Sequence, residues 1–136
     1  MTGKELIELA IKARERAYVP YSNYKVGAAV LGVDGRVFTG CNVENAAYSP
    51  TNCAERTAIF KAVSEGTTKF SSLAVVADSI VPVTPCGVCR QVMAEFFDPH
   101  TPVYLGNLKG DMVATTLEEL LPGAFTSKAL NQEGRH

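Results

Sequence analysis

The sequence lacks the features that would assign the protein to a membrane or to a polymeric nucleic acid. No apolar run approaches the roughly 18 residues that a bilayer-spanning helix needs, and the first residues lack the apolar core of a secretory signal peptide. The 13 basic residues nearly balance the 14 acidic ones, and the basic residues are scattered rather than clustered. We therefore expect a cytoplasmic protein that acts on a small free substrate, with no membrane partner and no DNA or RNA partner.

The chain also lacks low-complexity tracts, and its length limits how it can be organised. Its 136 residues suffice for one hydrophobic core but not for two. The hydrophobic share of 46% against 20% charged residues is typical of a globular chain. We predict a single domain over residues 1–136, with residues 128–136 forming a frayed polar tail.

Histidine is scarce, so a metal site in this chain would have to be built mainly from cysteine. The two histidines, His100 and His136, do not lie at a metal-ligand spacing, whereas four cysteines are present. In the cytoplasm thiols stay reduced, and clustered cysteines bind metal more often than they form disulfides. A structural zinc site normally has four protein ligands, whereas a catalytic site has three and keeps one position for water.

Three of the cysteines fall in two short motifs. Cys53 lies in Asn-Cys-Ala-Glu-Arg, while Cys86 and Cys89 lie in Pro-Cys-Gly-Val-Cys-Arg. Each motif opens a predicted helix, and the positive end of a helix favours thiolate over thiol. We predict that the three thiolates bind one Zn²⁺ ion. Glu55, two residues after Cys53, would lie beside the ion without binding it and would transfer protons.

The remaining cysteine and the Cys-x-x-Cys spacing leave alternatives open. Cys41 lies in a predicted strand, where a lone cysteine is usually a small buried hydrophobe, but it is the alternative ligand if one of the three is wrong. The Cys86 and Cys89 pair by itself would also suit a structural zinc site or a redox dithiol. A redox dithiol needs neither a third cysteine nor a carboxylate.

The apolar periodicity predicts an alternation of helices and strands. We expect helices at residues 2–18, 54–63, 86–97 and 116–121, and strands at residues 24–31, 36–42, 73–78, 102–105 and 111–115. This order predicts an α/β fold with three layers, α/β/α, around a mixed five-stranded sheet. Loops at the strand ends would bring both cysteine motifs to one rim of the sheet.

The two motifs resemble those of the zinc-dependent nucleoside deaminases. Cys-Ala-Glu followed by Pro-Cys-x-x-Cys is similar to the zinc signature of that family. Asn-x-Glu at residues 42–44, Pro-Cys-Gly-Val-Cys-Arg-Gln at residues 85–91 and Leu-Leu-Pro-Gly-Ala-Phe at residues 120–125 resemble the small cytidine deaminases that use only cysteine ligands. The similarity extends from about Tyr18 to Phe125 and implies a cytidine deaminase-like fold.

The resemblance also implies a reaction. It implies hydrolytic deamination of cytidine and deoxycytidine to uridine and deoxyuridine plus ammonia, as in pyrimidine salvage. Water activated by zinc would attack the pyrimidine at C4, and Glu55 would carry the protons. The family further implies one Zn²⁺ per subunit and a homotetramer with shared active sites, in which Phe125 serves a neighbouring subunit.

Several further residues acquire roles only through this resemblance. Asn42 and Glu44 would contact the ribose, which suits an amide and a carboxylate on the same side of an extended backbone. Ala54 would contribute to base recognition through its backbone. Tyr24 would pack over the substrate, and Phe125 would stack on the pyrimidine.

A centre with three thiolates carries surplus negative charge. Zn²⁺ with three thiolates has a formal charge of −1 (+2 and −3), which raises the pKa of a bound water. Arg56 lies three residues after Cys53 on the same helical face, and its guanidinium can donate hydrogen bonds to a ligand sulfur and withdraw this charge.

Two other functions remain open at the level of sequence. A deaminase of a nucleoside-like antibiotic such as blasticidin S would share the fold and the zinc site, because neither fixes the substrate. A non-catalytic, zinc-stabilised binding module would keep the scaffold alone. Glu55 argues against the second, since a structural site has no use for a general base.

Overall fold

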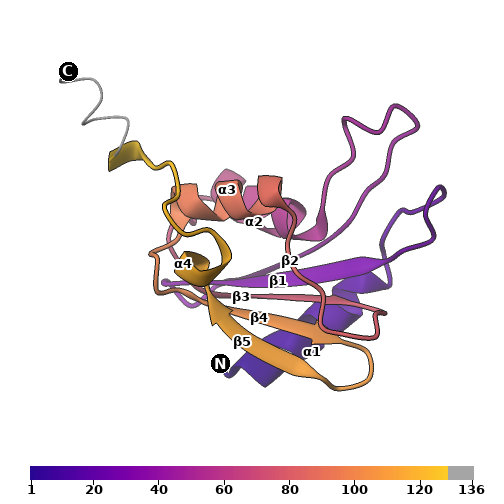
Figure 1. Ribbon diagram of the computed structural model, residues 1–136, viewed down its shortest axis with the longest axis horizontal. Helices are drawn as coiled ribbons and strands as arrows, with labels where there is room; N and C mark the ends of the chain where they lie inside the picture. Colours follow the sequence, from indigo (N-terminus) through magenta and orange to yellow (C-terminus); the bar gives the residue numbers. More distant parts are fainter. Residues whose placement is uncertain (129–136) are drawn as a thin grey trace.

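A mixed five-stranded sheet organises the chain, as a computed structural model shows for residues 1–128 (Figure 1). The strands are β1 (Val26–Gly32), β2 (Val37–Cys41), β3 (Phe70–Ala77), β4 (Pro102–Asn107) and β5 (Met112–Thr116). Their spatial order is β2-β1-β3-β4-β5, with β3 and β4 parallel and the other neighbours antiparallel. The helices are α1 (Gly3–Arg14), α2 (Ala54–Ser64), α3 (Gly87–Phe96) and the short α4 (Leu117–Leu120).

Helices cover both faces of this sheet, which confirms the predicted three-layer α/β/α fold. On one face α1 buries Leu6, Ile7 and Ala10 against β1 and β3. On the other face α2 and α3 bury residues such as Ile59 and Met93 against β1, β3 and β4. Figure 1 shows the two layers of helices on opposite sides of the strands.

The crossover from β3 through α3 to β4 brings the second cysteine motif to the rim of the sheet. β3 is buried along nearly all its length, as expected for a strand covered on both faces. Parallel strands cannot be joined by a tight turn, so the chain leaves β3, passes through α3 and returns as β4. The first turn of α3 therefore begins beyond the end of β3.

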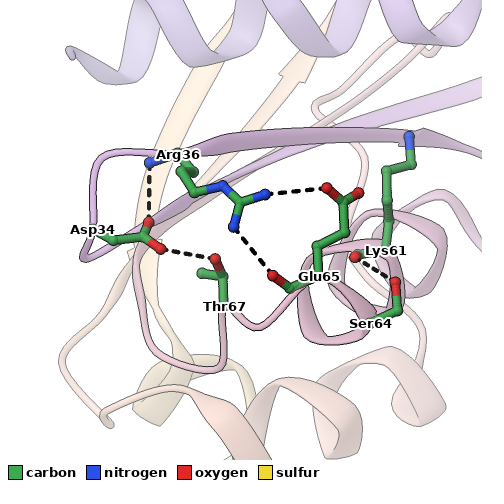
Figure 2. A network of polar contacts seen from close by, with 6 residues as sticks. All are labelled: Asp34, Arg36, Lys61, Ser64, Glu65 and Thr67. Atoms are coloured by element: carbon green, nitrogen blue, oxygen red, sulfur yellow. Dashed lines mark hydrogen bonds and ion pairs between the residues drawn. The ribbon is translucent and has the colours of Figure 1, made fainter.

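A network of polar side chains fixes the β1–β2 hairpin to the end of α2 (Figure 2). Asp34 accepts hydrogen bonds from the backbone N–H of Arg36 at 3.0 Å and from the hydroxyl of Thr67 at 2.8 Å. The Arg36 guanidinium donates to the carbonyl and to the carboxylate of Glu65, both at 3.1 Å. Since the Arg36 and Glu65 side chains are about half exposed, the ion pair itself contributes little stability, and the network mainly fixes geometry.

A glycine in β2 allows α2 to lie directly against the strand. A Cβ added at Gly40 would lie 2.5 Å from the backbone nitrogen of Ala58 and 2.7 Å from the carbonyl oxygen of Ala54. Further along, the Lys61 ammonium donates to the carbonyl oxygen of Thr39 at 2.5 Å. The distance between β2 and the first turn of α2 is therefore set by backbone contact.

The end of the first helix differs from the sequence prediction. A capping box of Thr2 and Glu5 begins α1, but the helix ends at Arg14 instead of near Tyr18. The backbone of Tyr18 instead donates to the carbonyl of Asn42 at 3.0 Å. This long-range bond draws the chain out of the helix before the periodic pattern ends.

The predicted tail, residues 128–136, lies outside the described residues except for its first residue. Within residues 1–128 no helix has the length and apolar character to cross a membrane.

Replacing Gly40 with alanine should destabilise the fold. The new methyl group would meet backbone atoms that cannot rotate away, and overpacking of this kind costs about 1–3 kcal/mol of unfolding free energy. Chemical denaturation measures the change. Gly87→Ala is the matched control, because a Cβ there meets nothing within 4 Å. Equal stability of the two variants would contradict the close approach of β2 and α2.

Candidate metal centre

Two helix N-termini bring three thiols together. Cys53 is the N-cap residue of α2 and Cys86 is the N-cap residue of α3, both with extended backbone and without a side-chain capping bond. Cys89 follows in the first turn of α3 and is buried. The three sulfurs lie within 4.8 Å of one another, as the two motifs predict. Unused as caps, the thiols are available to a metal.

The spacing of the sulfurs fits a zinc ion. Tetrahedral zinc with Zn–S bonds of about 2.3 Å places its sulfur ligands roughly 3.8 Å apart. The Sγ atoms of Cys53 and Cys86 are 3.7 Å apart. Cys41, the alternative ligand, is not part of this group within the described residues. It is a half-buried residue at the end of β2, so it is less buried than the sequence prediction held.

The thiols differ in how readily they ionise. The pKa of Cys53 falls to about 5, first because it accepts a hydrogen bond from Cys89 and further because Arg56 donates to it. The same contact with Cys53, together with burial, raises the pKa of Cys89. The first negative charge of the cluster therefore settles on Cys53.

Glu55 is buried in the first turn of α2, with only 4% of its surface exposed. Burial is the main reason why the pKa of this carboxyl is raised to about 7; the negative charge of Cys53 contributes to the rise, whereas a backbone hydrogen bond, Arg56 and a hydrogen bond with Cys89 oppose it. A carboxyl group with such a pKa both accepts and releases protons near neutral pH. It lies beside the thiols without belonging to the cysteine group.

Arg56 contacts the cluster as the sequence predicts. Its Nη2 atom lies 3.3 Å from the sulfur of Cys53 and 3.4 Å from the carbonyl oxygen of Thr51. Its Nε atom is buried and has no acceptor among the described residues. A buried donor without an acceptor is costly, and an anionic centre beside it offsets that cost.

Asn42 and Glu44 lie on the same side of the chain after β2, but both already bind protein atoms. The Asn42 side chain accepts from the backbone N–H of Val26 at 2.9 Å and donates to the carbonyl of Tyr24 at 2.8 Å. The Glu44 carboxylate accepts from the backbone N–H groups of Tyr21 and Ser22, each at 3.1 Å. Both side chains thus hold the segment that leads into β1.

A cavity of about 380 Å³ opens beside Glu44. It is lined by Tyr21, Ser22, Glu44, Tyr48 and Thr51, from the loops on either side of the β1–β2 hairpin. A larger cavity of about 600 Å³ lies between the end of α3, α4 and residues 123–128, and none of the predicted site residues lines it. The smaller cavity is therefore the one associated with a predicted site residue.

The other predicted substrate contacts differ in their surroundings. Ala54 is fully buried in the first turn of α2. Tyr24 is 41% exposed and Phe125 is 52% exposed, and the Phe125 carbonyl accepts from Gln91 at 2.9 Å. Neither aromatic ring lines either cavity.

Sequence reasoning overlooked the polar residues that support the site. Asn52 donates to the hydroxyl of Thr57 at 3.0 Å, and this hydroxyl donates to the carbonyl of Cys53 at 3.2 Å, which fixes the start of α2. Ser22 donates its hydroxyl proton to the Glu44 carboxylate. Such residues are common in turns, and their spacing gave no signal of these contacts.

Known proteins resemble this chain along most of its length. The family described as the cytidine and deoxycytidylate deaminase zinc-binding region matches residues 1–105. Over 131 residues the chain is 60% identical to the cytidine deaminase of Sporosarcina psychrophila, with 96% of each chain covered. It is also 60% identical to the cytidine deaminase of Halalkalibacterium halodurans, covering 96% of this chain and 99% of that one.

The fold agrees with a solved structure of the same kind. The crystal structure of cytidine deaminase from Burkholderia pseudomallei is 54% identical and matches with a TM-score of 0.89, covering 92% of this chain and all of that chain. A blasticidin-S deaminase from Bacillus cereus is more distant, at 33% identity over 130 residues, covering 88% of this chain and 91% of that one.

Removing a single sulfur should abolish tight zinc binding. We expect Cys89→Ser to bind zinc at least about 100-fold more weakly, because a buried ligand of the centre is lost, and we expect Cys41→Ala to bind one zinc per chain. Competition with a chromogenic chelator measures both affinities. Equal zinc affinity in the two variants would show that the sulfurs of this cluster do not hold the metal.

Proposed function

Because the chain belongs to the zinc-binding cytidine and deoxycytidylate deaminase family, we propose that it converts cytidine and deoxycytidine to uridine and deoxyuridine with release of ammonia. Deamination of cytidine is the reaction supported by 60% identity to cytidine deaminases over nearly the whole chain. The observation that carries the proposal is the group of three thiols at two helix N-termini, together with the buried carboxyl group of Glu55 in the first turn of α2.

The metal belongs at the cysteine cluster. Cys53, Cys86 and Cys89 would hold one Zn²⁺ per subunit. When bound, zinc would act as a Lewis acid that lowers the pKa of a water molecule. Arg56, 3.3 Å from the sulfur of Cys53, would withdraw negative charge from the ligand sulfurs.

Glu55 is the proton carrier in this proposal. Its carboxylate takes a proton from the attacking water and delivers it to N3 of the pyrimidine. After addition at C4, it passes the remaining proton of the water to the amino group, which departs as ammonia. Water and cytidine are consumed, and uridine and ammonia are formed. Burial beside the thiols suits this role, because a carboxyl group shielded from solvent exchanges protons with its bound partner.

The nucleoside would extend from the thiol cluster toward the end of β2. Ala54, directly after Cys53, would contact the base through its backbone, and Tyr24 would pack over the substrate. Asn42 and Glu44 would contact the ribose with the hydrogen-bonding capacity that their contacts to the segment before β1 leave free.

Sequence similarity favours free nucleosides over nucleoside-like antibiotics as the substrate. Identity to the blasticidin-S deaminase is 33%, against 60% for two cytidine deaminases. An ultraviolet assay that follows loss of cytidine, with blasticidin S in parallel and zinc quantified in the same sample, tests the proposal. Turnover of blasticidin S but not cytidine, or of neither by a zinc-loaded protein, would refute it.

Assembly would complete the site. We propose a homotetramer in the cytoplasm, acting in pyrimidine salvage, in which Phe125 stacks on the pyrimidine bound by a neighbouring subunit. The support is that the Phe125 ring is half exposed and lines neither cavity of its own chain. Exposed apolar segments often form subunit contacts, and a symmetric assembly makes the exchange reciprocal.

Glu55→Gln should keep the fold and the zinc but lose deamination. The amide has nearly the same shape yet cannot accept and release a proton, and removing a general acid or base typically costs at least about 10²-fold in rate. Turnover of cytidine and zinc content are measured on the same preparation. A loss of zinc that matches the loss of activity would make Glu55 a ligand instead.

A mixing experiment tests whether Phe125 acts in a neighbouring subunit. Unfolded Glu55→Gln and Phe125→Ala chains are refolded together, and turnover is measured at low cytidine concentration. If Phe125 acts in trans, the two defects fall in different sites, so some sites combine an intact Glu55 with an intact Phe125 and activity exceeds the average of the separate mutants.

The control is each variant refolded alone, with mixed oligomers demonstrated by mass spectrometry. If Phe125 acts in cis, every site keeps one defect. Activity no higher than the average of the two separate preparations would then exclude a shared site.

A further inference from the structure

We propose that Ser22 is a positioning residue for substrate binding, because its hydroxyl joins the Glu44 carboxylate to the backbone of Tyr24. This inference rests on the proposed function, in which Glu44 and Tyr24 contact the nucleoside. Ser22 is a turn residue in the segment before β1 and lies outside the sequence motifs described above.

The Ser22 hydroxyl is used in both directions. It donates its proton to Oε2 of Glu44 and accepts a hydrogen bond from the backbone N–H of Tyr24 at 3.0 Å. The backbone N–H of Ser22 also donates to Oε1 of Glu44 at 3.1 Å. A single residue thus contacts both oxygens of the carboxylate and the backbone of the aromatic residue.

These contacts leave Glu44 little freedom. A carboxylate offers about four acceptor positions. The backbone N–H groups of Tyr21 and Ser22 both bond to Oε1, and the Ser22 hydroxyl occupies one position on Oε2. One acceptor position therefore remains, on Oε2, and its direction is fixed by the three donors. A substrate hydroxyl would meet an acceptor that is already oriented.

Tyr24 is held in the same way. Its N–H donates to the Ser22 hydroxyl, and its carbonyl accepts from the side chain of Asn42 at 2.8 Å. Between Ser22 and Tyr24, Asn23 has a positive φ of 58°, in the left-handed region that asparagine adopts more readily than most residues. The bond between Ser22 and Tyr24 closes the turn over this residue.

The position of Ser22 links this arrangement to a binding site. Ser22, Glu44 and Tyr21 line the cavity of about 380 Å³, together with Tyr48 and Thr51. The hydrogen bond from the Ser22 hydroxyl is the main reason why the pKa of the Glu44 carboxyl is lowered, and the backbone N–H groups of Ser22 and Tyr21 lower it further. The carboxylate therefore stays ionised. A charged acceptor of fixed direction at a cavity wall selects substrates with a hydroxyl in the matching place.

Loss of the Ser22 hydroxyl should therefore weaken substrate binding more than it slows the chemical step. Without it, Oε2 of Glu44 and the N–H of Tyr24 both lose a partner, but Glu55 and the cysteine cluster are untouched. We expect Ser22→Ala to raise KM for cytidine about tenfold, which is the effect of losing one hydrogen bond to a charged group, and to change kcat less than twofold.

The experiment compares two isosteric variants with the alanine variant. Ser22→Thr keeps a hydroxyl and should restore most of the wild-type KM, whereas Ser22→Val has the same shape without it and should behave like Ser22→Ala. This pair decides the question if the alanine variant does not fold. Ser71→Ala, at an exposed position in β3, is the control for serine replacement in general.

A double-mutant cycle separates positioning from general stability. If Ser22 acts through Glu44, then Ser22→Ala should raise KM much less in a Glu44→Gln background than in the wild type. An unchanged KM in Ser22→Ala, a fall confined to kcat, or effects that add fully in the double mutant would overturn the inference. A failure of the proposed function would be distinguishable from these outcomes, because the wild-type protein itself would then not deaminate cytidine.

Discussion

The meeting of two helix N-termini is the constraint on which the rest of the structure depends. Cys53 is the N-cap residue of α2 and Cys86 that of α3, and their sulfurs lie 3.7 Å apart. Negative charge between two positive helix ends favours this arrangement, and thiolates supply it. The contact of β2 with α2 at Gly40 and the β3–α3–β4 crossover are the means by which the sheet holds both ends in place.

Most of the fold could be predicted from the sequence because its signals are local. Apolar periodicity acts within a few residues, and the order of helices and strands that it indicates predicted the mixed five-stranded sheet. The predicted end of α1 was wrong because the backbone N–H of Tyr18 donates a hydrogen bond to the carbonyl of Asn42, 24 positions away in the sequence. No local pattern reports a bond of that kind. The partly exposed state of Cys41 also depends on packing between elements.

The candidate site was predictable where residue chemistry alone defines it. Cysteines at the Cys-x-x-Cys spacing, a third cysteine and a nearby glutamate identify a metal centre, and the structure brings the three sulfurs together. The contacts of Glu44 with Tyr21 and Ser22 could not be predicted, since they join two loops on either side of a hairpin. Serine in a turn is common, and only the folded arrangement reveals what its hydroxyl binds.

Because the three sulfurs come from two separate parts of the chain, the stability of the fold also depends on the concentration of free metal. Cys53 belongs to the unit of β1, β2 and α2, whereas Cys86 and Cys89 belong to the crossover between β3 and β4. An ion held by both acts as a cross-link that closes the intervening chain and removes conformational entropy from the unfolded state, as a disulfide does. By mass action, each tenfold rise in free metal above the dissociation constant adds about 1.4 kcal/mol to the stability of the folded chain.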